Sequence, residues 1–248
     1  MRSPKSTYLR RLTLTLVAAL SIAARALASF AAPDDPLNAA VEAARRTHDE
    51  KQLQSVKGQL ERKMAQNANV AELWLDLAQV QGYFADVYEM RKEKKDAAEA
   101  VDKAIEAVQR SIQLNEKSAY APSLLADLYG RKISLGNGTF AGAKFGPKVK
   151  EENAKAMAMD DKNPRVWASL GRQYLMAPQM FGGDIPKAIE SFQKSLVIDP
   201  GQDETWVWLC KAWQKQGDKT KAREAVQHAL SLNPESPFAK AAAASLDK

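Results

Sequence analysis

The segment QDETWVWLCKAWQKQGDKTKAREAVQHALSLNPES, residues 202–236, contains two helical patterns separated by a turn. Each half places apolar and small residues three or four positions apart, which gathers them on one face of a helix. These residues are Trp206, Leu209, Cys210 and Trp213 in the first half, and Ala222, Val226 and Ala229 in the second. Gly217-Asp218 is expected to form the turn, with Asp218 as N-cap of the second helix. Because the residue before Pro234 disfavours helical backbone, the segment predicts one helix-turn-helix unit.

The pattern recurs at a lag of 34 residues, which indicates a repeat architecture. The matched pairs are Ala188 and Ala222, Phe192 and Val226, Ser195 and Ala229, and Pro200 and Pro234. These positions resemble the signature of the tetratricopeptide repeat (TPR) family. The resemblance implies an all-α fold, a right-handed superhelical solenoid of helix-turn-helix repeats. A Gly-rich segment ending Gly146-Pro147-Lys148 and the run APQMFGGD at 177–184 further resemble uncharacterised exported bacterial TPR proteins.

Weaker copies of the pattern extend the predicted repeats toward the N-terminus. We expect a signal peptide at residues 1–28 and N-terminal capping helices at 29–69. Four TPR units are predicted at about 70–117, 118–162, 163–201 and 202–236, followed by a C-terminal capping helix at 237–248. Atypical end helices are what a solenoid requires, because its terminal repeats must present a polar outer face to water.

The first 33 residues contain no acidic residue and have the three parts of an export signal. Basic residues up to Arg11 precede the apolar run Leu12–Ala24, and Ala26-Leu27-Ala28 fits cleavage after Ala28. The run is shorter than the roughly 20 residues that cross a bilayer. We therefore expect an exported protein of the bacterial periplasm. Secretion, anchoring by an uncleaved signal and mitochondrial targeting are the alternatives.

The net charge of +6 belongs mostly to the predicted signal. Removing its five basic residues from the chain's 36 leaves 31 bases against 30 acids. A near-neutral protein has no general attraction for nucleic acid, so no nucleic-acid partner is expected. The single cysteine, Cys210, can form no internal disulfide.

Three insertions relative to a plain TPR unit fall between the first and second helix of a unit. The first lengthens both helices, whereas the other two, at 131–148 and 177–184, are predicted to form loops along one edge of the solenoid. Gly146-Pro147 is expected to start the following helix, where Pro fits the first turn. Phe181 is expected to fill the gap between helices. The loop residues proposed to line a binding site are Phe140, Lys144, Phe145 and Phe181.

The concave groove is the second candidate surface, because in the TPR family it is lined by first-helix residues that face away from the signature side. The matching residues are Gln79, Tyr83, Tyr120, Asp127, Arg131, Arg165, Arg172, Lys211 and Lys215. Arg172, Lys211 and Lys215 are predicted to hold a carboxylate or an acidic peptide segment. A solvated charged face is the alternative. Some family members clamp a C-terminal carboxylate with Asn, but Ala168 and Val207 stand at the matching positions here.

Catalysis requires a nucleophile with a base, a carboxylate pair or a metal cluster, and the sequence suggests none of these. Its two imidazoles, His48 and His228, have no ligand-spaced companions. We expect no enzyme, no cofactor and no metal. The predicted function is a non-catalytic protein- or peptide-binding scaffold in the cell envelope. An envelope transport accessory for a small ligand or lipid is the alternative, and an enzyme is a remote one. The oligomeric state stays open.

Overall fold

The computed structural model describes residues 36–246, and within them every regular element is helical. The chain divides into two compact units, residues 1–39 and 40–248. The first unit contributes only residues 36–39 to the described part, so the predicted signal peptide lies outside the described residues. All contacts reported below lie within the second unit.

The helices are joined by short turns, and their bounds are as follows. They are α2 (Pro36–Thr47), α3 (Glu50–Gln66), α4 (Ala71–Met90), α5 (Lys94–Leu114), α6 (Tyr120–Leu135), α7 (Gly138–Met159), α8 (Pro164–Met176), η1 (Gln179–Phe181), α9 (Ile185–Ile198), α10 (Asp203–Gln216), α11 (Lys219–Leu232) and α12 (Pro237–Leu246). None of these helices combines the length and the apolar character needed to cross a membrane.

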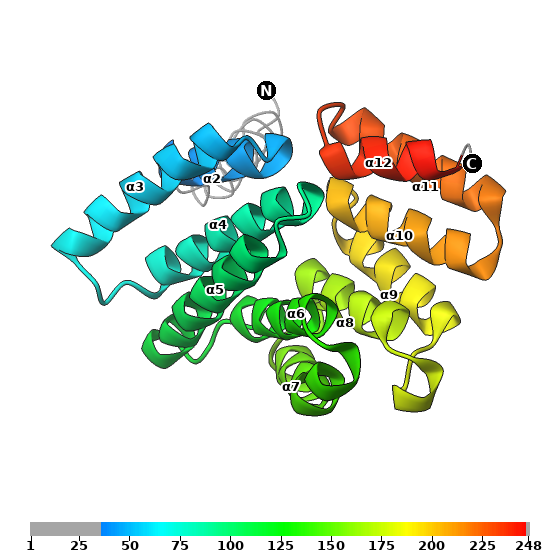
Figure 1. Cartoon of the computed structure of the whole chain (residues 1–248), viewed down its shortest axis with the longest axis horizontal. Coiled ribbons are helices and arrows are strands. Elements are labelled where there is room, and N and C mark those ends of the chain that lie inside the picture. Colours follow the sequence, from blue (N-terminus) through cyan, green and yellow to red (C-terminus); the bar gives the residue numbers. More distant parts are fainter. Residues whose placement is uncertain (1–35, 247–248) are drawn as a thin grey trace, which may run out of the picture. The chain divides into compact units, whose positions relative to one another are not determined.

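From α4 to α11 the helices pack as successive pairs (Figure 1). α4 packs against α5, α6 against α7, α8 against α9 and α10 against α11, and each pair packs against the next. α12 packs against both helices of the last pair. The protein is therefore an all-helical repeat solenoid, and the predicted fold class is confirmed.

Side-chain caps fix where the second helices of the last two pairs begin. The carboxylate of Asp184 accepts a hydrogen bond from the backbone N–H of Lys187, and Asp218 does the same for Lys221, both at 3.0 Å. Before Asp218, Gly217 has a φ of 91°, the left-handed conformation that glycine adopts without strain and that commonly ends a helix. The Gly217-Asp218 turn and the Asp218 cap predicted from the sequence are confirmed.

Three tryptophans tie the first helix of a pair to the turn before it. The indole Nε1 of Trp74 donates to Ala68 O at 2.7 Å, and Trp167 donates to Asp161 O at 2.6 Å. Trp206 donates to Pro200 O at 3.0 Å. Each bond spans six residues and satisfies a turn carbonyl next to a half-buried ring. The tryptophan of the signature therefore stabilises the junction between units as well as the core.

The second insertion is helical, and the prediction of a loop there is wrong. α6 continues to Leu135 and α7 begins at Gly138, so that only Gly136-Asn137 connects them. Pro147 consequently lies inside α7, not in its first turn. A proline cannot donate to the carbonyl four residues earlier, but Ala143 and Pro147 are both exposed, so water can satisfy that carbonyl.

Candidate functional site

The predicted groove residues come from the first helices α4, α6, α8 and α10, and several of them contact one another. The Tyr120 hydroxyl donates to Gln79 Oε1 at 3.2 Å, and Arg165 donates to the same oxygen at 3.2 Å. The Arg165 guanidinium also lies 4.4 Å from the centre of the Tyr120 ring. This contact joins side chains of three successive pairs, α4–α5, α6–α7 and α8–α9.

Arg131 is held by two acidic residues of α4. It lies 2.6 Å from Asp86 Oδ1 and 3.6 Å from Glu89 Oε1, and it donates to Gly82 O at 3.3 Å. On the other side of Asp86, His48 Nε2 lies 3.4 Å from Oδ2. Burial acts to raise the pKa of Asp86, but Arg131 and His48 outweigh it and hold that pKa below its ordinary value. Arg131 is thus neutralised inside the protein.

Arg172 is likewise neutralised, by Asp127 of α6. Its Nε donates to Asp127 Oδ1 at 2.9 Å, and a terminal nitrogen donates to the second oxygen of the same carboxylate. The Ser169 hydroxyl donates to Asp127 Oδ1 at 2.8 Å. A two-pronged arginine-carboxylate pair of this kind has fixed geometry. Arg172 therefore positions Asp127 and has little charge left for an external ligand.

Lys211 differs from these arginines. Its amine lies 4.3 Å from the centre of the Trp208 ring, and within residues 36–246 no carboxylate is at ion-pairing distance from it. Burial lowers the pKa of Lys211, an effect that Asp86 and Glu89 offset only in part. Lys211 is thus a half-buried cation whose lost hydration is replaced mainly by an aromatic face.

An open pocket of about 390 Å³ lies beside this lysine. Leu175, Met176 and Trp208 form its apolar lining, and Lys211, Gln214 and Lys215 its polar lining. Lys215 donates to Leu175 O at 2.8 Å, which places the second amine at the pocket's edge. Two of the three cations predicted to act together, Lys211 and Lys215, therefore meet at one pocket.

Trp208 is a pocket residue that the predicted groove did not include. The ring is half-buried and lies between Lys211 and Arg172, whose guanidinium is 5.9 Å from the ring centre. Trp206 and Trp213 occupy signature positions of the repeat, whereas Trp208 does not. An aromatic residue outside the signature, one helical turn from a predicted groove lysine, was the signal that could have identified it.

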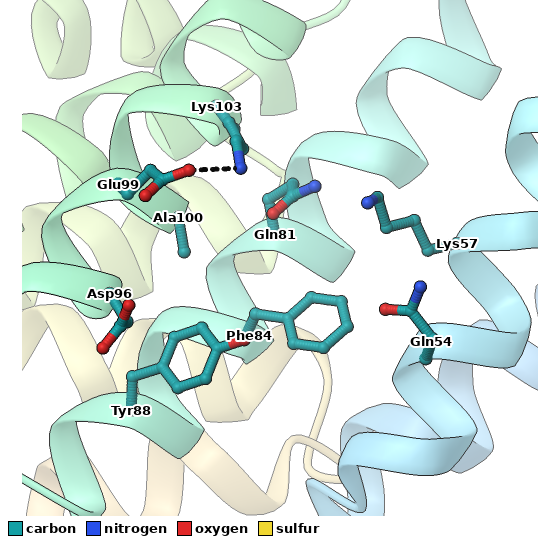
Figure 2. Close-up of a pocket in the computed structure, with 9 residues that line it drawn as sticks. All are labelled: Gln54, Lys57, Gln81, Phe84, Tyr88, Asp96, Glu99, Ala100 and Lys103. Carbon is teal, nitrogen blue, oxygen red and sulfur yellow. Dashed lines mark hydrogen bonds and ion pairs between the residues drawn. The ribbon is translucent and has the colours of Figure 1, made fainter. Parts of the chain in front are cut away.

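A second, smaller cavity of about 150 Å³ lies among α3, α4 and α5 (Figure 2). Gln54 and Lys57 of α3 face Gln81 and Phe84 of α4 across it. The Phe84 and Tyr88 rings are stacked at 6.2 Å, and the nearby Glu99 and Lys103 pair with each other at 2.7 Å. None of the predicted site residues lines this cavity. The remaining lining residues are Asp96 and Ala100.

The end of α2 contacts the last helices of the second unit. Arg45 lies 2.8 Å from both Asp203 and Glu204 of α10, and Arg46 donates to Leu232 O at 2.7 Å. The Asn233 side chain donates back to Arg46 O at 3.0 Å. Sequence reasoning missed these contacts, because nothing in the local pattern links residues so far apart in the chain.

His48 extends this contact into the groove. It lies in the turn after α2 with a φ of 52°, a conformation unusual for a residue with a side chain. Its ring meets Tyr83 of α4 and Phe238 of α12 edge-on, at 5.6 and 4.8 Å between ring centres. The predicted groove residue Tyr83 is therefore covered by the N-terminal turn.

The structure places the predicted insertion residues in different surroundings. Phe145 stacks on Tyr129 of α6 at 5.7 Å, and the Lys144 amine lies 5.1 Å from the centre of the Phe145 ring. Phe140 is exposed at the start of α7. Phe181 is 60% exposed, so the prediction that it fills the gap between helices is wrong. Neither of the two cavities described above includes any of the four.

Residues 40–248 match the family model described as "Regulator of microtubule dynamics protein 1-3". The chain belongs to this family. No curated protein matches it.

Solved structures of TPR proteins resemble the chain in fold. A thermophilic TPR protein from Thermus thermophilus is 14% identical, with a TM-score of 0.63 over 85% of this chain and 98% of that one. MamA is 17% identical, with a TM-score of 0.40 over 82% of this chain and 98% of its own. YrrB, described as a TPR protein with an unusual peptide-binding site, is 12% identical, with a TM-score of 0.40 over 82% of this chain and 89% of its own. The predicted TPR resemblance is confirmed.

Proposed function

We propose that the protein is a non-catalytic scaffold that binds an acidic or carboxylate-bearing segment of another protein at the pocket between α8 and α10. The observation that carries this proposal is Lys211, a half-buried amine beside a pocket, stacked on Trp208 and lacking a carboxylate among the described residues. Arg131 and Arg172 each pair with a carboxylate of the protein, whereas Lys211 does not. A carboxylate of the ligand would provide the missing ion-pair partner.

The energetic reason is the hydration that Lys211 has lost. A buried charge is costly unless it is paired, and a charge-assisted hydrogen bond is about twice as strong as a neutral one. The Trp208 ring already positions the Lys211 amine. Binding a ligand therefore costs less side-chain entropy than it would at an exposed, mobile lysine. An anionic group placed between Lys211 and Lys215 therefore gains more than it does on an open surface.

The apolar side of the pocket specifies what accompanies the carboxylate. Leu175, Met176 and Trp208 form a floor that suits an aliphatic side chain, and Met adapts its shape to different partners. A volume of about 390 Å³ accommodates a residue or two, not a folded domain. We infer that the bound element is the end of a chain, an apolar terminal residue with its free carboxylate.

The family description supports a protein partner, because it names regulation of microtubule dynamics for its members 1–3. The sequence at 1–28 supports a different location, the cell envelope. The N-terminal residue of the protein purified from its cells distinguishes the cell envelope from the cell interior. If the protein is exported, intact mass spectrometry should find that it begins at Ser29. A protein that retains Met1 and stays with the cell interior would contradict the envelope location and leave the scaffold proposal intact.

The test of binding uses a synthetic peptide rich in Asp and Glu that ends in Leu with a free carboxylate, measured by titration calorimetry. Lys211→Gln should weaken binding about tenfold, the loss expected for one charge-assisted hydrogen bond. Lys240→Gln, at an exposed lysine of α12, is the matched control and should bind as the parent does. Amidating the peptide's terminus should weaken binding to the parent protein and leave Lys211→Gln unaffected.

Equal affinities of the parent protein and Lys211→Gln for this peptide would exclude the pocket. Recovery of a small molecule or lipid, and of no protein, with the parent protein would instead support the transport alternative.

A further inference from the structure

The edge formed by the start of α7 and by η1 exposes large apolar side chains to solvent. Phe140 is 75% exposed, Met180 83% and Phe181 60%. Phe140 and Phe181 are the only exposed phenylalanines in the described part of the chain. The others there are buried or half-buried, namely Phe84, Phe145, Phe192 and Phe238. Exposed bulky apolar side chains gathered in one region indicate an interaction surface.

The end of η1 lies next to α7 at Lys150. Gly182, which ends η1 with a φ of 93°, packs against α7: a Cβ added there would lie 3.6 Å from the Lys150 amine. Lys150 and Phe140 are ten residues apart on α7, about 15 Å along the helix and about 80° around it. The apolar tip of η1 therefore lies beside a lysine of the same helix that exposes Phe140.

Three lysines lie along the first part of α7, and no acidic residue lies between them. Lys144, Lys148 and Lys150 are exposed, and residues 128–150 contain no Asp or Glu. The Lys144 and Lys148 amines lie over the aromatic rings of Phe145 and Tyr129, and no ion pair to a carboxylate is formed by these three lysines among residues 36–246. The first part of α7 thus carries an exposed phenylalanine and three lysines without a carboxylate partner among the described residues.

We propose that this edge docks onto the surface of a bilayer containing anionic phospholipid, with Phe140, Met180 and Phe181 inserted among the lipids and the lysines at the headgroups. The charge of the lysines complements anionic headgroups, and apolar side chains flanked by Lys are typical of proteins that lie on a membrane. A protein partner fits less well, because the exposed apolar side chains lie on two separate elements, α7 and η1, and neither cavity includes them.

The test reads membrane contact at single positions of the full chain. Cys210 is fully buried, and burial raises the pKa of its thiol to about 11, so a cysteine introduced elsewhere is labelled selectively at neutral pH. An environment-sensitive fluorophore is attached to Met180→Cys. The matched control is Val197→Cys, at a residue 84% exposed near the far end of α9, about 18 Å along that helix from its start.

With vesicles of equal parts phosphatidylserine and phosphatidylcholine, the emission of the probe at position 180 should shift to the blue, and the emission at 197 should not. Pure phosphatidylcholine should give a much weaker response. Changing Lys144 and Lys150 together to Gln should lower the partition coefficient about 25-fold, or fivefold per lysine, and Phe140→Ser should lower it at least tenfold.

Three outcomes would overturn the proposal. The probe at 180 shows no shift with anionic vesicles, which leaves a protein as the occupant of this edge. Alternatively, the probes at 180 and 197 shift equally, which means that another part of the chain brings the protein to the vesicle without this edge touching it. In the third, the Gln variants bind as the parent does. None of these results bears on peptide binding at Lys211, because Phe140, Met180 and Phe181 do not line its pocket.

Discussion

At the scale of single residues, the contact between Gly171 and Phe192 shows how closely α8 and α9 approach. A Cβ added at Gly171 would lie 2.6 Å from the Phe192 ring, and that ring is completely buried. A ring in a filled core cannot move away cheaply. The glycine of the TPR signature is therefore required for space at this position, not for its backbone freedom.

Gly171→Ala should lower the free energy of unfolding by about 1–3 kcal/mol, because it overfills the core. Gly130→Ala is the matched control. A Cβ at Gly130 meets nothing within 4 Å, so that variant should be stabilised by about 0.5–1 kcal/mol through the helix propensity of Ala. Urea denaturation followed by circular dichroism gives the free energy of unfolding of both variants. If both substitutions changed it by the same amount in the same direction, the assigned packing would be contradicted.

Lys211 gives a prediction about pH. Because burial lowers its pKa in the free protein, an anionic ligand that favours the charged amine should raise that pKa on binding. The affinity for the acidic peptide should be highest at pH values below the lowered pKa of Lys211. It should decrease as the pH rises through that pKa, so the decrease should begin before the pH reaches 10.5, the ordinary pKa of a lysine. Titration calorimetry from pH 7 upward checks this, with Lys211→Gln expected to lack the decline. Affinity that stays constant over this range in the parent protein would argue against an anion at Lys211.

At the scale of helices, α7 is a single long helix with a proline, Pro147, in its interior. Pro147→Ala restores a backbone donor and should stabilise the protein by about 1–3 kcal/mol, since Pro is the least favourable residue in a helix interior. Hydrogen exchange should slow for the amides between Ala143 and Glu151 and stay unchanged in α10. Unchanged exchange in α7 would mean that Pro147 does not weaken the helix.

The helices of the repeats and their caps could be predicted from sequence, because both depend on residues a few positions apart. Asp184 and Asp218 lie directly before the helices that they cap, and the signal for each is local. The second insertion was misread because its glycines and Pro147 suggested a loop. The packing of Phe145 on Tyr129, which supports helical structure there, depends on tertiary contact that the sequence pattern does not reveal.

The candidate site was predicted in part for the same reason. The positions of Lys211 and Lys215 on the first helix of a repeat predicted that both line the groove. The structure places both at one pocket. Register does not reveal which cations are already neutralised. Asp127 pairs with Arg172 and Asp86 with Arg131 across two different helices, and only the folded arrangement distinguishes these arginines from Lys211.

At the scale of the second unit as a whole, Arg45 connects the start of the described chain to α10. Asp203, its partner, is only 3% exposed, and the Asn233 side chain donates to its second oxygen at 2.8 Å. Breaking a buried ion pair from one side is strongly destabilising, because the remaining charge keeps its desolvation cost. This contact should therefore matter more for stability than the exposed helix-surface pairs.

Arg45→Gln should lower the free energy of unfolding by about 3–5 kcal/mol, the cost of leaving a buried carboxylate without its cation. Arg110→Gln, on the exposed surface of α5, should change it by less than about 0.5 kcal/mol. Chemical denaturation measures both, and a second, earlier transition in Arg45→Gln is expected, since repeats without long-range ties unfold in segments. Similar values for the two variants would show that the Arg45 pair contributes nothing to stability.

The Arg45 contact also sets an order of events during synthesis. Its partner Glu204 lies 159 residues later in the chain, so at ribosomal rates roughly 8–30 seconds pass before that partner has been made. Throughout this interval the repeats can pair with their neighbours while Arg45 lacks its partners on α10. The end of α2 is therefore not held by this contact until α10 is complete, and a chain truncated before Asp203 should remain sensitive to proteolysis at α2.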